Sequence, residues 1–281
     1  MDWLFFALLS TASFAMAVIA DKYLLGYIKS VSAYLVALII FQQIFVIAVI
    51  AFVGTNFIYP ISILEMLTGA AQAASYISYL RALKVEEASR VTSLIFVYPL
   101  FVFVGAAVFL GEVLTLKDYV GGTILVISAF LVSYRMSNLR QPTISPALKH
   151  ILFFWIFSVF YALEIKYLLS FVNEWHLFIW SSIGALFAVV PLLADREILD
   201  DTYKIFVSDY HLRGAMLLEE IFDFLGRLAS LFAFALGPVA LVSAIGAMQP
   251  SMTLICILAL SRFVPGVINE ELDRKSLTLK F

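Results

Sequence analysis

The sequence has little charge for its length. Only 14% of its 281 residues are charged and 63% are hydrophobic, whereas a soluble domain carries about 25% charged and 45–50% apolar residues. Mean hydropathy is +1.01. A soluble fold of this size cannot bury so much apolar surface, so the lipid bilayer must act as the solvent for most of it.

Other residue types are scarce enough to exclude whole classes of site. The single cysteine, Cys256, cannot form an internal disulfide. Three histidines without a Cys/His cluster argue against zinc. A net charge of −2 gives no basis for nucleic-acid binding, and no GxxxxGK loop for ATP is present. We therefore expect no metal, no cofactor, no nucleic-acid partner and no enzyme activity.

What the chain does contain is a series of long apolar stretches. A membrane-spanning helix needs about 20 mostly apolar residues. The first stretch lacks the basic residues that precede a signal peptide, so we interpret it as a spanning helix. Nine candidate spans result: 3–20, 32–54, 62–83, 88–110, 116–134, 149–170, 176–194, 213–236 and 239–260.

Short motifs of the first half recur in the same order in the second half. Lys-Tyr-Leu-Leu ends the first and sixth spans, Ala-Leu ends the third and eighth, a proline lies midway along the fourth and ninth, and Leu-Thr-Leu-Lys opens the fifth span and recurs at the end of the chain. We therefore predict two repeats, residues 1–140 and 141–281. Because five spans is an odd number, the second repeat is inverted relative to the first, as in many secondary transporters.

The repeat also predicts a tenth helix that the sequence lacks. Leu277–Lys280 matches the start of the fifth span, yet Phe281 follows it directly. Our interpretation is a truncated or frameshifted product or a fragment, and a genuine nine-helix protein is the alternative.

One region carries a family resemblance. Ala82-Leu83-Lys84-Val85-Glu86-Glu87-Ala88-Ser89-Arg90-Val91, followed by Tyr98-Pro99 and by Phe109-Leu110-Gly111-Glu112, resembles the signature of EamA-type transporters in the drug/metabolite transporter (DMT) superfamily. The resemblance implies an all-α integral membrane fold of two inverted five-helix repeats around a central cavity, with about nine of the ten helices here. In the second half, Asn269-Glu270-Glu271 replaces the closing Gly-Glu of the family.

Membrane orientation is left open by two arguments that disagree. Most of the 18 basic residues fall on the side that carries the loop after the first span, and the positive-inside rule then places the N-terminus outside. The family resemblance implies that both termini lie in the cytoplasm.

The eighth span contains the most informative charges: Glu219, Glu220, Asp223 and Arg227. Residues 219, 223 and 227 share one helix face because they are four apart. An ionised group near mid-bilayer costs at least about 2.5–3.5 kcal/mol, so these groups should face protein or water. We expect Arg227 to pair with Asp223 in a substrate-binding or proton-coupling site. The alternative is a structural ion pair.

Equivalent positions in the two repeats supply further candidates. Lys22 and Lys166 could bind an anionic group of a substrate, or could extend to the membrane interface instead. Pro99 and Pro250 free backbone carbonyls that could line a cavity and serve as hinges, although a plain kink is the alternative. Their neighbours Tyr98 and Gln249, and Gln72 and Tyr76 of the third span, are predicted cavity residues; helix packing is the alternative for the third-span pair.

These features predict a secondary active transporter of small metabolites, an exporter or exchanger that works by alternating access and is coupled to protons. The mixed charges favour a zwitterion such as an amino acid. Alternatives are a non-transporting scaffold or inactive fragment, and a membrane-embedded lipid-modifying enzyme. Expected partners are a small-molecule substrate, membrane lipids and a second copy in a homodimer, in the plasma or inner membrane.

Overall fold

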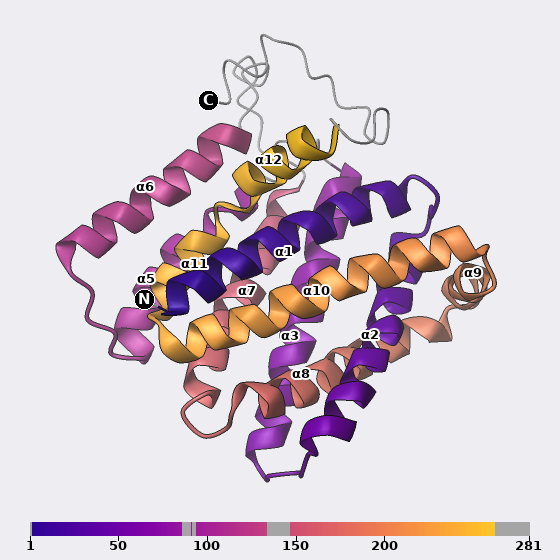
Figure 1. The fold of residues 1–281 in the computed structure, drawn as a ribbon, viewed down its shortest axis with the longest axis horizontal. Helices are drawn as coiled ribbons and strands as arrows, with labels where there is room; N and C mark the ends of the chain where they lie inside the picture. Colours follow the sequence, from indigo (N-terminus) through magenta and orange to yellow (C-terminus); the bar gives the residue numbers. More distant parts are fainter. Residues whose placement is uncertain (1, 86–90, 92–93, 134–146, 262–281) are drawn as a thin grey trace.

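The computed structural model describes residues 2–85, 91, 94–133 and 147–261 (Figure 1). Within these ranges the regular structure is helical, as predicted, and contains no strand. The helices are α1 Asp2–Leu25, α2 Val31–Val53, α3 Ile61–Val85, α5 Tyr98–Phe109, α6 Leu116–Ser133, α7 Leu148–Leu168, α8 Glu174–Val189, the 3-10 helix η2 Val190–Ala194, α9 Arg196–Phe206, α10 Tyr210–Leu236, α11 Val239–Gly246 and α12 Gln249–Ser261.

Several of these helices are long and apolar enough to cross a bilayer. Five stretches in the described residues qualify by length and composition: Asp2–Leu25, Val31–Val53, Leu148–Leu168, Glu174–Ala194 and Val239–Ile257. α10 is the longest helix, with 27 residues, but does not qualify because charged residues interrupt its apolar sequence. The chain is thus a multi-pass integral membrane protein.

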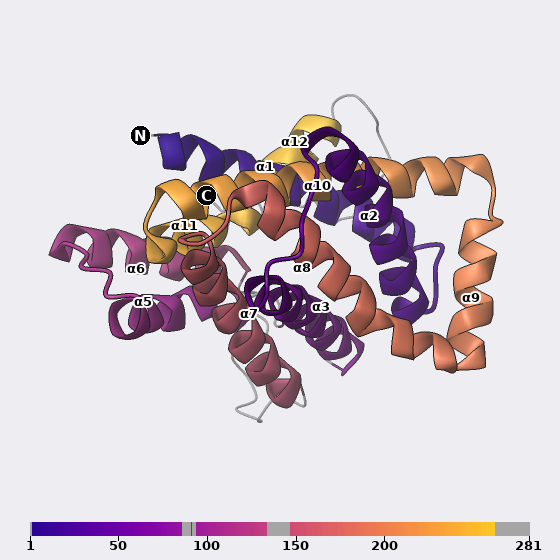
Figure 2. The same cartoon turned by 90° about the horizontal axis from the view of Figure 1, so that it is seen from below.

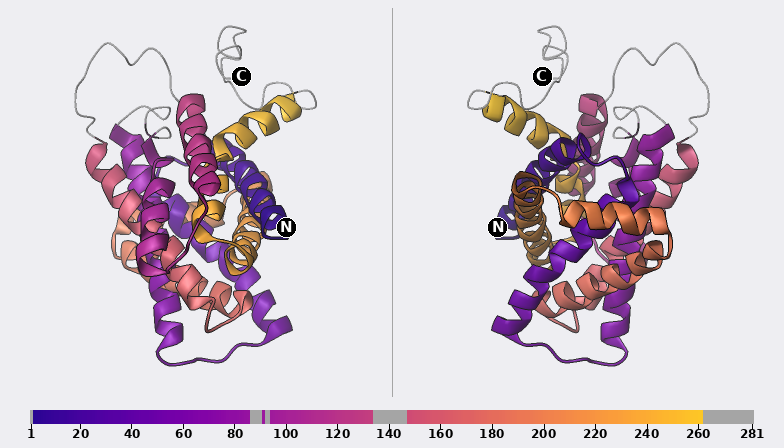
Figure 3. Two further views of the ribbon diagram at one scale, coloured as in Figure 1. Left: turned by 90° about the vertical axis from the view of Figure 1, so that its left-hand side faces the viewer. Right: turned by 90° about the vertical axis from the view of Figure 1, so that its right-hand side faces the viewer.

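The helices form two layers, one behind the other. α1 and α10 run antiparallel and side by side across one face of the molecule, and α3 packs against α7 and α8 behind them (Figure 1). α5 and α6 lie at one end of the molecule, and α2 and α9 lie at the other (Figure 2). α2 and α3 extend to the lower end of the molecule, where residues 54–60 join them (Figure 3).

Four helices begin where a polar side chain caps the first turn. Ser30, Asn173, Asp195 and Asp209 precede α2, α8, α9 and α10, and each accepts a hydrogen bond from a backbone N–H two or three residues later, over 2.9 to 3.3 Å. Such caps satisfy amide groups that have no partner within the helix. They also explain why α10 starts at Tyr210, three residues before its predicted start.

Two predicted spans are interrupted. The span predicted at 239–260 forms α11 and α12, separated by a turn at 247–248, and α12 begins one residue before Pro250. In the described part of the span predicted at 88–110, a turn at 96–97 precedes α5, which begins one residue before Pro99. Proline lacks an amide hydrogen and fits the first turn of a helix, so each proline starts a new segment.

The stretch 195–212, which lies between two predicted spans, is mostly helical. It contains α9 and the first residues of α10. α9 is amphipathic: Thr202 and Ile205 are buried on its inner face, and Phe206 stacks on Phe41 of α2 with ring centroids 5.1 Å apart. The apolar residues recur at helical spacing, which is a pattern that a search for long apolar runs misses.

Glycine lets α3 and α8 approach closely. A Cβ atom at Gly69 would lie 1.7 Å from the Ser181 carbonyl oxygen, and one at Gly184 would lie 2.0 Å from the Met66 carbonyl oxygen. Backbone contact through small residues is a common way for membrane helices to associate. This contact holds α8 against the helix that carries Tyr76.

Candidate functional site

Four carboxylates gather where α1 and α10 pack together. Asp21 comes from α1, and Glu219, Glu220 and Asp223 come from α10, and the four interact electrostatically. We call them the acidic cluster. Glu219 and Glu220 are only 4% and 3% exposed, whereas Asp21 and Asp223 are half-buried. Three of the four, Glu219, Glu220 and Asp223, were noted in the sequence.

Asp21 was missed by our sequence analysis. Its two carboxylate oxygens accept hydrogen bonds from two tyrosines, Tyr34 of α2 and Tyr76 of α3, the second over 3.1 Å. The predicted first span ended at residue 20, whereas α1 continues to Leu25. An acidic residue in the last turns of an apolar helix was the available signal, because such residues are rare within membranes and are usually functional.

Arg227 does not form the direct ion pair with Asp223 that we expected. It is 4% exposed, donates a hydrogen bond to Ser182 Oγ of α8 at 3.3 Å and lies 5.5 Å from the centre of the Phe178 ring. Asp223 interacts with Arg227 electrostatically but makes no ion pair with it. The predicted direct pair is therefore wrong, because the guanidinium is directed towards α8 instead.

Side chains from α2 and α7 complete the surroundings of Asp223. The carboxamide of Gln42, in α2, lies against the Asp223 carboxylate, and Gln42 Oε1 is buried without a hydrogen-bond partner. Tyr161 of α7 lies close enough to interact with both Asp223 and Arg227. The sequence gives little signal for Gln42, since a glutamine in an apolar helix is usually a packing residue.

The other predicted cavity residues lie on neighbouring helices. Tyr98 interacts with Tyr161, so it is linked through that tyrosine to Asp223. Gln249 donates a weak hydrogen bond, 3.4 Å long, to the Phe14 carbonyl of α1. Gln72 is half-buried, and its Oε1 is buried without a partner. Their roles in substrate binding remain predictions.

Lys166 is bound to backbone carbonyls at the end of a helix. Its Nζ donates hydrogen bonds to the Phe234 and Gly237 carbonyls at 2.7 and 2.8 Å. Lys166 therefore caps the C-terminus of α10, where a cation is favoured by the helix dipole. Its predicted roles, in binding a substrate or at the membrane interface, stay predictions. The side chain of Lys22, its predicted counterpart, lies outside the described residues.

Comparison with protein families gives a match for the first part of the chain. Residues 1–134 match the family model described as the EamA-like transporter family. The match places residues 1–134 in the DMT superfamily. No curated protein matches it. The matched range contains Asp21 and the side chains of Tyr34, Gln42 and Tyr76 described above, whereas α10 lies outside it.

The EamA-type signature residue Glu112 has a structural role here. Its Oε1 accepts a hydrogen bond from the Val239 amide at 2.8 Å, so it caps the N-terminus of α11. Glu112 and Lys166 thus hold the two ends of the turn between α10 and α11, one at each helix terminus. This part of the family signature positions α10 and does not contact the acidic cluster in any described interaction.

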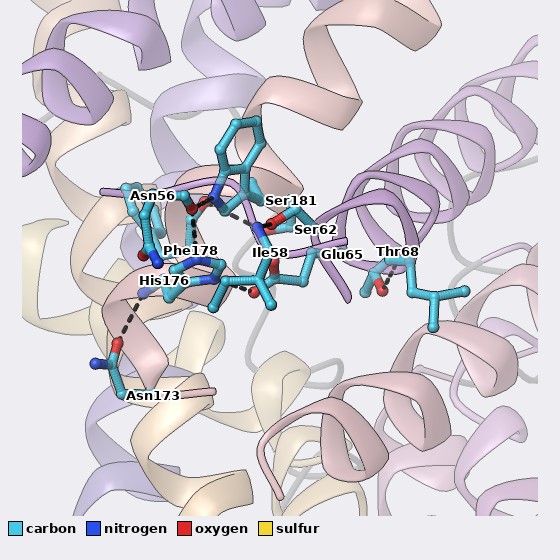
Figure 4. A network of polar contacts seen from close by, with 11 residues as sticks. Asn56, Ile58, Ser62, Glu65, Thr68, Asn173, His176, Phe178 and Ser181 are labelled. Carbon is cyan, nitrogen blue, oxygen red and sulfur yellow. Dashed lines mark hydrogen bonds and ion pairs between the residues drawn. The ribbon is translucent and has the colours of Figure 1, made fainter. Parts of the chain in front are cut away.

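A second buried polar group ties the α2–α3 connection to α8 (Figure 4). His176 Nδ1 lies 2.8 Å from Glu65 Oε1, and His176 Nε2 lies 2.9 Å from the Asn56 carbonyl, which also accepts a hydrogen bond from Trp180 at 3.1 Å. Because a carbonyl only accepts, Nε2 must carry a proton. Nδ1 then shares one proton with Glu65, and the pair is neutral overall. We call this group the Glu65–His176 staple.

Proposed function

We propose that this chain is a secondary transporter that moves small polar metabolites across the membrane through the acidic cluster. The observation that supports this most is the concentration of buried carboxylates between α1 and α10, helices that otherwise carry mainly apolar residues. Each charge near mid-bilayer costs at least about 2.5–3.5 kcal/mol. The alternative of a structural ion pair would require a direct contact with Arg227, and Arg227 makes none with Asp223, the carboxylate nearest to it along the helix.

Alternating access is the mechanism that the packing supports. α1, from the first predicted repeat, packs against α10 of the second, and α7, from the second, packs against α3 of the first. This reciprocal arrangement is what two inverted repeats, 1–140 and 141–281, would produce. Rocking of one half against the other would expose the acidic cluster to each side of the membrane in turn.

The breaks before Pro99 and Pro250 provide the hinges in this proposal. At each of them the helix is interrupted for two residues, at 96–97 and 247–248, before it resumes. Short interruptions of this kind can absorb the backbone rotation that a change of access requires. In the absence of an ATP-binding motif, an ion gradient or exchange drives transport, and the cluster carboxylates are the groups that would carry protons.

Reconstitution into proteoliposomes tests this proposal. Vesicles that contain the purified full chain are loaded with labelled amino acids, amines, nucleobases or sugars to measure efflux, or are exposed to them from outside to measure uptake. We expect saturable flux of at least one compound. Asp223→Asn should reduce that flux at least about tenfold, because it removes a charge from the cluster. The matched control is Asp200→Asn, which changes an exposed carboxylate of α9 and should leave the flux unchanged.

Two results would overturn the proposal. Folded protein without saturable flux for any compound would favour a non-transporting scaffold. Turnover of the liposome lipids without solute flux would favour a lipid-modifying enzyme.

A further inference from the structure

In its fully ionised form, the acidic cluster has more negative than positive charge. Four carboxylates interact there, and Arg227 is the basic residue with which they interact among the described side chains. Even if Lys22, the sequence neighbour of Asp21, is counted as a second cation, carboxylates outnumber cations two to one. Arg227 is also occupied by Ser182 and Phe178. A bound anion would therefore meet repulsion, and a bound cation would be attracted.

When Glu219 and Glu220 are ionised, the unpartnered buried atoms of the site are all hydrogen-bond acceptors. Glu219 Oε2, Glu220 Oε2 and Gln42 Oε1 are buried and have no hydrogen-bond partner, and these three residues are at most 4% exposed. An acceptor buried without a donor costs about 1–3 kcal/mol, and more if it is charged. The arrangement is thus complementary to a ligand that donates several hydrogen bonds. A protonated primary amine provides three.

Aromatic rings surround the same carboxylates. The Tyr34 and Tyr76 hydroxyls bind Asp21, Tyr79 is close enough to interact with Asp21, and the Tyr76 and Tyr79 rings are 6.0 Å apart and tilted to each other. The faces of such rings attract cations by about 0.5–2 kcal/mol. Carboxylates beside tyrosine rings form a suitable environment for an ammonium group with an apolar substituent.

We propose that the transported substrate is a positively charged primary or secondary amine, bound through its N–H groups between Asp21, Glu219 and Asp223 and against the rings of Tyr76 and Tyr79. The inference rests on the transport function proposed above and narrows the zwitterion that the sequence favoured to a net cation. A quaternary ammonium ion has the charge but no N–H donor, so it should be transported poorly.

Flux measurements on a charge-matched series test this inference. Proteoliposomes containing the full chain are assayed with 2-phenylethylamine, putrescine and agmatine, with the N,N,N-trimethyl derivative of 2-phenylethylamine, with phenylalanine as a zwitterion, and with 3-phenylpropionate as an anion. We expect saturable flux of at least one primary amine and at least tenfold lower flux of the quaternary compound and the anion.

Two variants connect the result to the site. Asp21→Asn and Glu219→Gln should each raise the amine concentration for half-maximal flux by about tenfold or more, whereas Asp200→Asn should not. If phenylalanine or 3-phenylpropionate is transported and no amine is, the inference is wrong, but the transporter proposal is still supported. Equal flux of the quaternary compound, or amine flux that neither variant alters, would also overturn it. Absence of any flux would instead overturn the transporter proposal itself.

Discussion

Removal of one partner of the Glu65–His176 staple should destabilise the fold strongly. Glu65 is fully buried, and His176 is 8% exposed. His176→Leu removes the group that holds Glu65 Oε1 at 2.8 Å and also the hydrogen bond to the Asn56 carbonyl. The carboxyl group that remains cannot reach water, and its Oε2 already lacks a partner.

The expected free energies follow from these contacts. Breaking a buried pair from one side costs about 3–5 kcal/mol, which is our expectation for His176→Leu. Glu65→Leu should cost less, about 1–3 kcal/mol, because His176 keeps its hydrogen bond to Asn56. The double variant should cost less than the sum of the two, with a coupling energy of about 1.5–3 kcal/mol.

Equilibrium unfolding of the purified protein in detergent micelles provides the measurement. Free energies of unfolding are compared for the two single variants, the double variant and His211→Leu, a change at an exposed histidine that should stay within about 0.5 kcal/mol. If His176→Leu is no more destabilising than His211→Leu, or if the two staple substitutions are additive, the staple is not a coupled buried pair and the reasoning fails.

Two further predictions concern packing and capping. Gly184→Val should lower the free energy of unfolding by at least about 3 kcal/mol, since even a Cβ atom there would lie 2.0 Å from backbone. The control is Gly214→Ala, because Gly214 faces open space. Equal effects of the two substitutions would contradict the close packing of α3 and α8. Lys166→Met should lower the free energy of unfolding by about 1.5–3 kcal/mol in the same assay, because it removes two hydrogen bonds at the end of α10. If it lowers this free energy no more than Lys117→Met, a change at an exposed lysine, Lys166 does not cap the helix.

The sequence predicted most of the fold because apolar length is a direct physical requirement of the bilayer. Predicted spans such as 32–54 and 149–170 correspond closely to α2 and α7. Where the prediction failed, another interaction determined the boundary. A polar cap at Asp209 moved the start of α10, and the turn before Pro250 divided one predicted span into α11 and α12.

The site was only partly predictable. Spacing along one helix placed Glu219 and Asp223 on a common face, because that relation depends on helix geometry alone. The partners of these residues depend on which helices pack together. The contact of Asp21 with the cluster, and the direction of Arg227 towards Ser182, are set by α1–α10 and α8–α10 packing, and spacing within one helix contains no information about either.

The central claim is that Asp223 faces a water-filled, substrate-binding region inside the protein. A labelling rate tests this claim directly. Asp223→Cys is introduced into a Cys256→Ser background, and its reaction with a membrane-impermeant, positively charged methanethiosulfonate reagent is measured in reconstituted vesicles. Leu225→Cys, whose side chain is 43% exposed on the outer face of α10, is the matched control. We predict rapid modification at position 223, slowed by a transported amine, and little at position 225. Modification at 225 with none at 223 would contradict the account.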